Sequence, residues 1–300
     1  MNKFICALIL SATAAIAAAA PATPPARAVM PYAMADTAVH QVASKELKRT
    51  YEIAVSLPEG YKTSTRRYPV VFVSDANYAF PLVRSLSKRV GDGGRGLEDF
   101  ILVGLGYSQG DSPTFARRRD YTPGQPAETD LKPDESGRAP QFGQAEAYRR
   151  FIASEVFPLI AQRYRADMAR KVFVGHSYGS LLGLHILFTD SAMFDQYIMG
   201  SPSLWYGKQH MFEREKAYAE KHRDLKARIF FAVGGQEMPS PEHPERSDMV
   251  GELKRFENIL RARQYPGLRI HSRVFDGEDH LTVAPAILTH GLKWTLPARK

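Results

Sequence analysis

The sequence of 300 residues predicts an α/β protein with a mostly parallel sheet and helices on both of its faces. Short apolar runs rich in β-branched residues alternate with longer segments of helical spacing, which is typical of parallel strands buried on both faces. Near the start, by contrast, apolar and polar residues alternate one by one, which predicts an antiparallel edge. We find no internal repeat and no region of clearly different amino-acid composition, so we expect a single domain over residues 29–300.

The first 28 residues have the features of a secretory signal peptide. Lys3 gives a positive start, an apolar stretch rich in alanine follows, and small residues offer cleavage positions near residues 18–28. This stretch is too short for a convincing membrane span, and no later one reaches about 18 apolar residues, so we expect no membrane span. We therefore expect a periplasmic or secreted protein. Its only cysteine, Cys6, would leave with the signal, so the mature chain would form no disulfide.

The remaining elements follow from the same patterns, in order along the chain. Alternation predicts two strands within residues 39–61, joined by a polar turn at Lys45–Lys48. The segment 108–144 is rich in Gly, Pro, Asp and Arg without period, which predicts a long loop of functional or mobile character. Further strands are expected at 70–73, 99–107, 171–175, 194–202, 227–235 and 268–277, and helices at 80–90, 145–164, from 178 onward, 207–222, 248–264 and 282–296.

A Gly-x-Ser-x-Gly pattern stands where the strand ending at Gly175 meets the helix that begins at Tyr178. The pattern alone is weak evidence, but on a strand–turn–helix corner it is typical of a nucleophilic serine. The turn exposes Oγ of Ser177 at the carboxyl edge of the sheet, and the helix N-terminus offers N–H groups to a developing negative charge. We therefore predict that Ser177 is a nucleophile. The alternative is a structural Gly-Ser turn.

A serine nucleophile requires a base, which in this arrangement follows the last strand, while an acid comes earlier in the chain. Among nine histidines, only His280 lies in a polar turn between the last strand and the last helix, so we predict it as the base. Glu237, just after the strand at 227–235, is the predicted acid that orients the imidazole. Asp248 is the alternative acid, and a Ser–His pair without an acid is a further alternative.

Two backbone N–H groups should hold the oxyanion of the reaction intermediate. One is expected from Tyr178, the residue after the nucleophile. The second should come from the turn after the strand at 70–73, and the sequence leaves open whether Asp75, Ala76 or Asn77 donates it.

Taken together, these residues resemble the esterase-D-type branch of the α/β-hydrolases, and within it the periplasmic siderophore esterases that open enterobactin-like trilactones. The marks are LPEGY, YPVVFVSDANYAF, VGLGY, RRRDYTP, GHSYGS, SPSLWY, VGGQE and DGEDH, which span nearly all of the mature chain. The resemblance implies an α/β-hydrolase fold, with Arg118 and Arg119 of the basic loop and Trp205 as substrate contacts. One departure is the turn SDAN at 74–77, where relatives commonly carry Asp-Gly, and it bears on the oxyanion geometry.

The sequence thus predicts a serine hydrolase of carboxylic esters, in particular the lactone esters of a ferric catecholate siderophore such as enterobactin. The net charge of +8, or +6 once Lys3 and Arg27 are removed, fits an anionic substrate as well as an ordinary basic surface. The alternatives are a feruloyl or acetyl esterase, a general carboxylesterase, an acyltransferase, and a siderophore-binding protein without turnover. The sequence shows no metal-ligand, dinucleotide or nucleic-acid motif, so we expect no metal, organic cofactor or nucleic-acid partner.

Overall fold

The computed structural model describes residues 32–127 and 131–298. Residues Asp36–Lys300 form one compact unit, to which the following description refers. The predicted signal peptide, residues 1–28, lies outside the described residues. Within the described part of the chain, no helix combines the length and the apolar character that crossing a bilayer requires.

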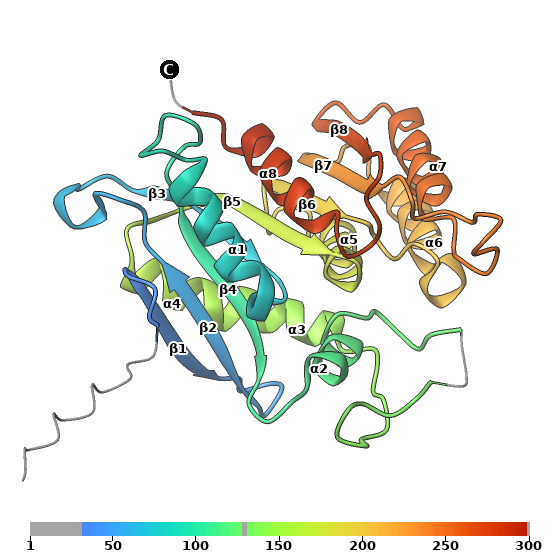
Figure 1. Ribbon diagram of the computed structural model, residues 1–300, viewed down its shortest axis with the longest axis horizontal. Coiled ribbons are helices and arrows are strands. Elements are labelled where there is room, and N and C mark those ends of the chain that lie inside the picture. The colour runs from blue at the N-terminus through green and yellow to red at the C-terminus, as the bar shows by residue number, and fades with distance from the viewer. Residues whose placement is uncertain (1–31, 128–130, 299–300) are drawn as a thin grey trace, which may run out of the picture. The chain divides into compact units, whose positions relative to one another are not determined.

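A single sheet forms the centre of this unit. Its strands are β1 (Thr37–Ala43), β2 (Thr50–Ser56), β3 (Tyr68–Val73), β4 (Ile101–Ser108), β5 (Ala166–His176), β6 (Gln196–Gly200), β7 (Ala227–Gly234) and β8 (Leu268–Phe275). They lie in the order β1-β2-β4-β3-β5-β6-β7-β8 (Figure 1). The pairs β1–β2 and β2–β4 are antiparallel and the other pairs are parallel. The predicted α/β class with an antiparallel N-terminal edge is therefore confirmed.

Helices cover both faces of this sheet (Figure 1). They are α1 (Ala76–Arg89), α2 (Pro113–Asp120), α3 (Ala145–Phe151), α4 (Phe157–Arg163), α5 (Tyr178–Thr189), α6 (Tyr206–Lys221), α7 (Met249–Ala262) and α8 (Ala284–Thr295). On β6, Ile198 packs against Gly291 of α8, whereas the next residue, Met199, packs near Gly183 of α5. Successive strand residues point to opposite faces, so α8 and α5 lie on opposite sides of the sheet.

Aromatic side chains fill the layer between the sheet and α5. Phe72, Phe173, Phe194 and Tyr197 are at most 1% exposed. Their neighbouring ring centroids lie 5.3 to 6.3 Å apart. Such pairs contribute about 0.5–1.5 kcal/mol each beyond the burial of their area. This layer holds β3, β5 and β6 firmly beneath the edge at which the predicted nucleophile lies.

The segment 108–144, expected to be a loop throughout, contains the helix α2. Ser112 caps this helix, since its Oγ accepts a hydrogen bond from the N–H of Phe115 at 3.2 Å, and Pro113 stands at the first helical position. Both are ordinary start signals. The helix itself is short and rich in arginine. Ion pairs with the distant residues Asp75 and Arg49 support it, so its periodicity gave no signal.

The helix expected at 145–164 is interrupted by a π-helical turn at Ile152–Val156. Pro158 follows directly, within α4. Because proline has no N–H and its ring crowds the carbonyl one turn earlier, a wider turn relieves the strain without ending the helix. The helix expected at 80–90 begins earlier, at Ala76, which brings its N-terminus to the carboxyl edge of β3.

Candidate active site

Ser177 lies on the sharp corner between β5 and α5. Its backbone has φ 59° and ψ −118°, which is a strained conformation for a residue with a side chain. Its N–H donates to the carbonyl of Gly200 at 2.9 Å, which anchors the corner to β6. A Cβ at Gly175 would lie 2.4 Å from the backbone of Gly179, and one at Gly179 would lie 2.3 Å from Ser74 Oγ. The flanking glycines are therefore required by close packing.

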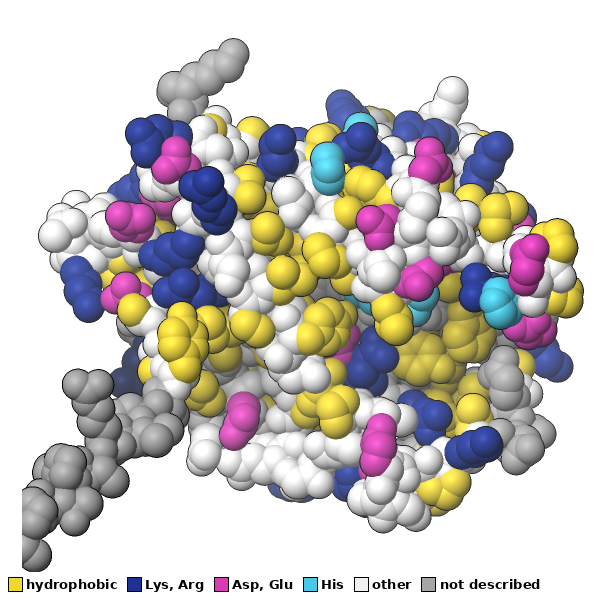
Figure 2. Space-filling model, viewed as in Figure 1, with side chains coloured by type: hydrophobic (Ala, Val, Ile, Leu, Met, Phe, Trp, Pro, Cys, Tyr) yellow, Lys and Arg dark blue, Asp and Glu magenta, His cyan; other side chains and the backbone are white. Residues whose placement is uncertain are grey.

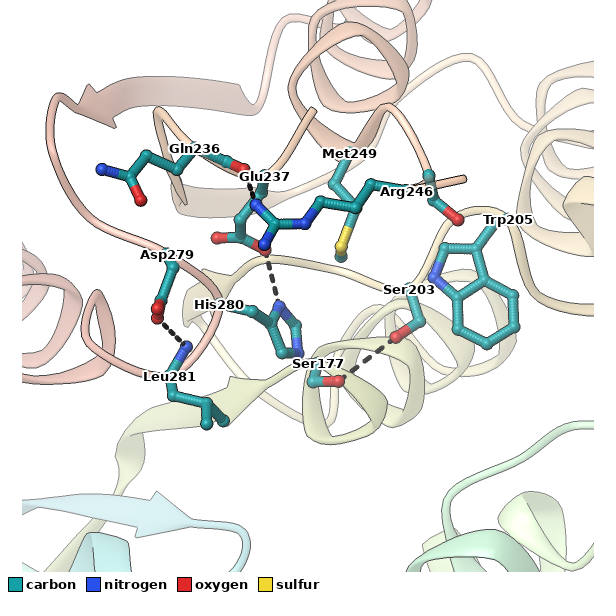
Figure 3. A pocket seen from close by; sticks show the side chains of 11 residues that line it. Ser177, Ser203, Trp205, Gln236, Glu237, Arg246, Met249, Asp279, His280 and Leu281 are labelled. Atoms are coloured by element: carbon teal, nitrogen blue, oxygen red, sulfur yellow. Dashed lines mark hydrogen bonds and ion pairs between the residues drawn. The ribbon is translucent and has the colours of Figure 1, made fainter. Parts of the chain in front are cut away.

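His280 and Glu237 come from two different loops at the same edge of the sheet. Nδ1 of His280 lies 2.6 Å from Oε2 of Glu237 (Figure 3). The other carboxylate oxygen, Oε1, accepts hydrogen bonds from Ser201 Oγ at 2.6 Å and from the N–H of Gly234 at 2.7 Å. Glu237 is 5% exposed, so its carboxylate makes all of these contacts while it is itself buried. It can hold the ring with Nε2 free to accept a proton.

Asp248, the alternative acid, has a different task. Its carboxylate accepts a hydrogen bond from the N–H of Gly251 at 2.8 Å and caps the N-terminus of α7. Asp248 is exposed, as a capping residue commonly is. Of the two acids that the sequence left open, the structure brings Glu237 against His280.

The hydroxyl of Ser177 points to another serine. Its Oγ lies 3.4 Å from Oγ of Ser203, and within the described residues this is its only hydrogen bond (Figure 3). Ser177 and His280 line the same cavity. A rotation about χ1 of Ser177 would turn the hydroxyl from Ser203 toward the imidazole, and such contacts commonly tighten only when substrate is bound.

Two cavities meet at Ser177, His280 and Leu281. The first cavity has a volume of about 410 Å³ and is also lined by Ser203, Trp205, Glu237 and Arg246. The second cavity has a volume of about 600 Å³ and is also lined by Asn77, Tyr78, Tyr107, Arg117, Arg118 and Tyr178. Figure 2 shows a hollow on the right of the molecule, where hydrophobic, basic and histidine side chains lie next to one another.

The predicted oxyanion donors lie at two helix N-termini beside the second cavity. Tyr178 begins α5, and Ala76 and Asn77 begin α1. Asp75, which precedes α1, is fully buried with φ 54°. Its Oδ1 accepts hydrogen bonds from Tyr107 Oη at 2.6 Å and from Arg117 Nε at 2.7 Å.

This network around Asp75 holds the start of α1. Burial alone would lower the pKa of Arg117, but the adjacent Asp75 carboxylate leaves that pKa above its ordinary value, so Arg117 stays cationic. Sequence reasoning missed the network. The only signal for it was an acidic residue directly after a buried strand.

Comparison with known proteins places the chain among esterases. The family model described as "Putative esterase" matches residues 44–283. The chain belongs to this family. The ferri-bacillibactin esterase BesA of Bacillus subtilis (strain 168) is 30% identical to it over 269 residues, covering 87% of this chain and 89% of BesA. The siderophore triacetylfusarinine C esterase of Aspergillus fumigatus is 29% identical over 262 residues, covering 81% of this chain and 87% of the relative.

A solved structure agrees with this membership. The IroE-like serine hydrolase from Shewanella oneidensis has a TM-score of 0.72 and 26% identity, covering 86% of this esterase and 79% of that chain. The expected α/β-hydrolase fold and the resemblance to the esterase-D-type branch with its siderophore esterases are confirmed. The protein is a carboxylic ester hydrolase.

The arginines of the basic run in the esterase are divided between two environments. Arg119 was expected to contact substrate, but it is 3% exposed and its guanidinium pairs with Asp111 at 2.7 Å and Asp120 at 2.8 Å. That expectation is corrected here. Arg118, next to it, lines the second cavity, and its Nη1 donates to the carbonyl of Lys132 at 2.8 Å. Consecutive helical residues point about 100° apart, so α2 turns one arginine inward and the other toward the cavity.

Trp205 lines the first cavity of the esterase, and its ring lies 6.1 Å from that of Tyr178. It follows the turn Ser201–Ser203, whose two serines contact Glu237 and Ser177. Sequence reasoning used this turn only as a mark of resemblance. Two hydroxyls beside a tryptophan at the end of a buried strand were the available signal.

His176 lies beside His280 at the second cavity of the esterase. Its ring centroid lies 4.7 Å from that of His280, and it lines the second cavity. Burial, followed by the positive charges that His280 and Arg117 carry or would carry, lowers the pKa of His176 to about 3. His176 is therefore neutral at the pH at which an esterase works, and it adds no charge beside His280.

Proposed function

We propose that this esterase is an exported serine hydrolase that opens the ester bonds of a siderophore. The observation that carries the proposal is the hydrogen bond of 2.6 Å between His280 and Glu237 in a cavity that Ser177 also lines. The strained corner at Ser177 supports its role as nucleophile. The relatives named for ferri-bacillibactin and for triacetylfusarinine C support a siderophore as the class of substrate.

In this mechanism Ser177 attacks the ester carbonyl carbon while Nε2 of His280 takes the hydroxyl proton. The tetrahedral intermediate collapses, the bond to the alcohol oxygen breaks, and His280 returns the proton to the departing alkoxide. Glu237 keeps Nδ1 protonated and stabilises the imidazolium. A water molecule that gives its proton to His280 then hydrolyses the acyl-enzyme.

Backbone N–H groups would stabilise the oxyanion that forms in both steps. We assign one to Tyr178 and the other to the start of α1, at Ala76 or Asn77. The ion pair between Asp75 and Arg117 supports this assignment, since it ties the start of α1 to α2 and so limits movement of the donor.

The second cavity suits an anionic aromatic ligand. We propose a ferric catecholate of the enterobactin type, whose net negative charge would be attracted by Arg118 and Arg117. Tyr78, which is 40% exposed, and Trp205 in the first cavity offer aromatic faces for catechol rings. We retain Arg118 and Trp205 as proposed substrate contacts.

The test uses the mature protein and Ser177→Ala, a substitution that removes only the hydroxyl. Both are incubated with ferric enterobactin, iron-free enterobactin, a feruloyl ester and a p-nitrophenyl ester, and products are followed by mass. We expect ferric enterobactin to be opened by the wild type and the rate to fall at least about 1,000-fold in Ser177→Ala.

Each other outcome identifies a competing function. Lactone opening that survives Ser177→Ala would contradict the nucleophile, and rapid feruloyl cleavage with an intact lactone would indicate a carbohydrate-type esterase. Acyl transfer to an added alcohol in preference to water would indicate an acyltransferase. Saturable binding without products would indicate a binding protein.

The proposed export is tested separately. Cell fractionation followed by intact-mass measurement should find the protein in the periplasm or the medium, with its N-terminus between residues 18 and 29. An intact Met1 in the cytoplasmic fraction would contradict it.

A further inference from the structure

The turn Ser201–Ser203 joins β6 to α6 and places two hydroxyls beneath the first cavity. Ser201 is 0% exposed and Ser203 is 1% exposed. The N–H of Ser201 donates to the carbonyl of Ala232 at 2.7 Å, and the N–H of Leu204 donates to the carbonyl of Pro202 at 2.7 Å. The ring of Pro202 fixes its φ, and the hydrogen bonds of Ser201 and Leu204 hold the turn on either side of it. Its two serine side chains are held in place by the core.

These two hydroxyls contact the two ends of the proposed catalytic triad, Ser177 and Glu237. Ser203 Oγ lies 3.4 Å from Ser177 Oγ, the reacting atom. Ser201 Oγ donates to Oε1 of Glu237 at 2.6 Å, and the N–H of Gly234 donates to the same oxygen. Because Oε1 is occupied twice, the carboxylate is oriented with Oε2 toward His280. Figure 3 shows Ser203 beside Ser177, with His280 on the other side of the nucleophile.

We propose that this turn is part of the catalytic machinery, with Ser203 as a further catalytic residue and Ser201 as a positioning residue for Glu237; the proposal rests on the function proposed above. The Ser203 hydroxyl donates to Oγ of Ser177, so the proton of Ser177 remains available for His280. As His280 takes the proton of Ser177, partial negative charge develops on Oγ before it passes to the carbonyl oxygen, and a preorganised donor to Oγ lowers the cost of removing that proton.

The first experiment measures the nucleophile without a carboxylic ester. A fluorophosphonate reacts with an activated serine: the Oγ–P bond forms, the P–F bond breaks, fluoride leaves and the hydroxyl proton goes to His280. We expect Ser203→Ala to slow this reaction about tenfold, equal to the loss of one charge-assisted hydrogen bond. Ser203→Thr, which keeps a hydroxyl, should retain more of the rate than Ser203→Ala.

The controls separate chemistry from folding. Ser154→Ala makes the same change at an exposed hydroxyl that, among the described residues, bonds the carbonyl of Arg150 alone, and it should react at the wild-type rate. Thermal unfolding of all variants is measured alongside. A wild-type rate in Ser203→Ala, or an equal loss of rate in Ser203→Ala and Ser203→Thr, would overturn the role of Ser203 and leave the proposed function standing. A wild type that does not react at all would overturn the proposed function as well.

Ser201 is tested by a double-mutant cycle with Glu237, read as kcat for a p-nitrophenyl ester. We expect Ser201→Ala to lower kcat about fivefold in the wild type and less than about twofold when Glu237 is already glutamine. A merely structural role would lower kcat by the same factor in both backgrounds. Equal factors would therefore overturn the positioning role of Ser201.

Discussion

The two cavities that meet at Ser177 differ in how their polar groups are held. In the first cavity, the polar groups of Glu237, His280 and Ser203 bond mainly to one another and to the core. In the second, Arg118 lies near the surface, and its one hydrogen bond to another described residue is to a loop carbonyl. Arg117 and Tyr107 there are tied inward, through the buried Asp75.

This difference indicates which cavity can perform chemistry and which cavity can adapt to a ligand. Proton transfer requires groups fixed within a few tenths of an ångström, and the buried hydrogen bonds of Glu237 provide such fixation. A cation that keeps most of its hydrogen-bonding capacity free can move to meet a large anion. We therefore assign the proton transfers to the first cavity and recognition of charge to the second. The following predictions test that division.

The largest effect is expected in the first cavity, from Glu237→Gln. The amide no longer stabilises the imidazolium, so kcat should fall well beyond tenfold for neutral and anionic esters alike. Asp248→Asn is the matched control, because it alters the other candidate acid, which caps α7. It should leave kcat near the wild-type value. Near-normal turnover by Glu237→Gln would favour a Ser–His pair without an acid. A large loss of kcat in Asp248→Asn would identify Asp248 as the acid.

A smaller and selective effect is expected in the second cavity, from Arg118→Ala. KM for an anionic ferric siderophore should rise about three- to tenfold, while KM for a neutral p-nitrophenyl ester should stay nearly unchanged. The difference should shrink at high salt, because exposed charges are screened. Equal effects on both esters would mean that Arg118 does not recognise charge.

Arg119→Ala provides the contrast to Arg118. It removes the cation that Asp111 and Asp120 share, although each keeps another arginine partner, Arg138 and Arg49. The free energy of unfolding should therefore fall by about 2 kcal/mol, the loss of hydrogen bonds to charged groups. KM for the anionic and the neutral ester should change by the same factor. A selective rise for the anionic ester, with unchanged stability in urea, would return Arg119 to the substrate site.

The smallest effect concerns His176, which lines the second cavity beside His280. Its pKa is about 3 in the folded state and about 6.5 when unfolded. The unfolded chain therefore binds more protons between these values, so this residue costs stability progressively as pH falls from about 6.5 toward 3. His176→Phe should show a shallower decline of Tm over this range. Identical pH profiles of Tm for the variant and the wild type would contradict the buried neutral state.

Local and periodic features let the sequence predict the succession of strands and helices along the chain, the corner at Ser177 and the loops that carry Glu237 and His280. These three side chains line one cavity because parallel strands bring their carboxyl ends to one edge, which chain order alone implies. The helix α2 was missed because ion pairs with the distant residues Asp75 and Arg49, rather than an apolar stripe, stabilise it.

By itself, the sequence determined the α/β class and the strand–turn–helix corner, since these depend on periodicity and on contacts between neighbours along the chain. The esterase family followed from the resemblance of its motifs. Only the tertiary structure decided which of Arg118 and Arg119 faces a cavity, and that Asp248 caps a helix. It also decided that Ser203 stands beside Ser177. Such outcomes depend on the direction in which each side chain leaves its element, and on partners that are far away in the chain.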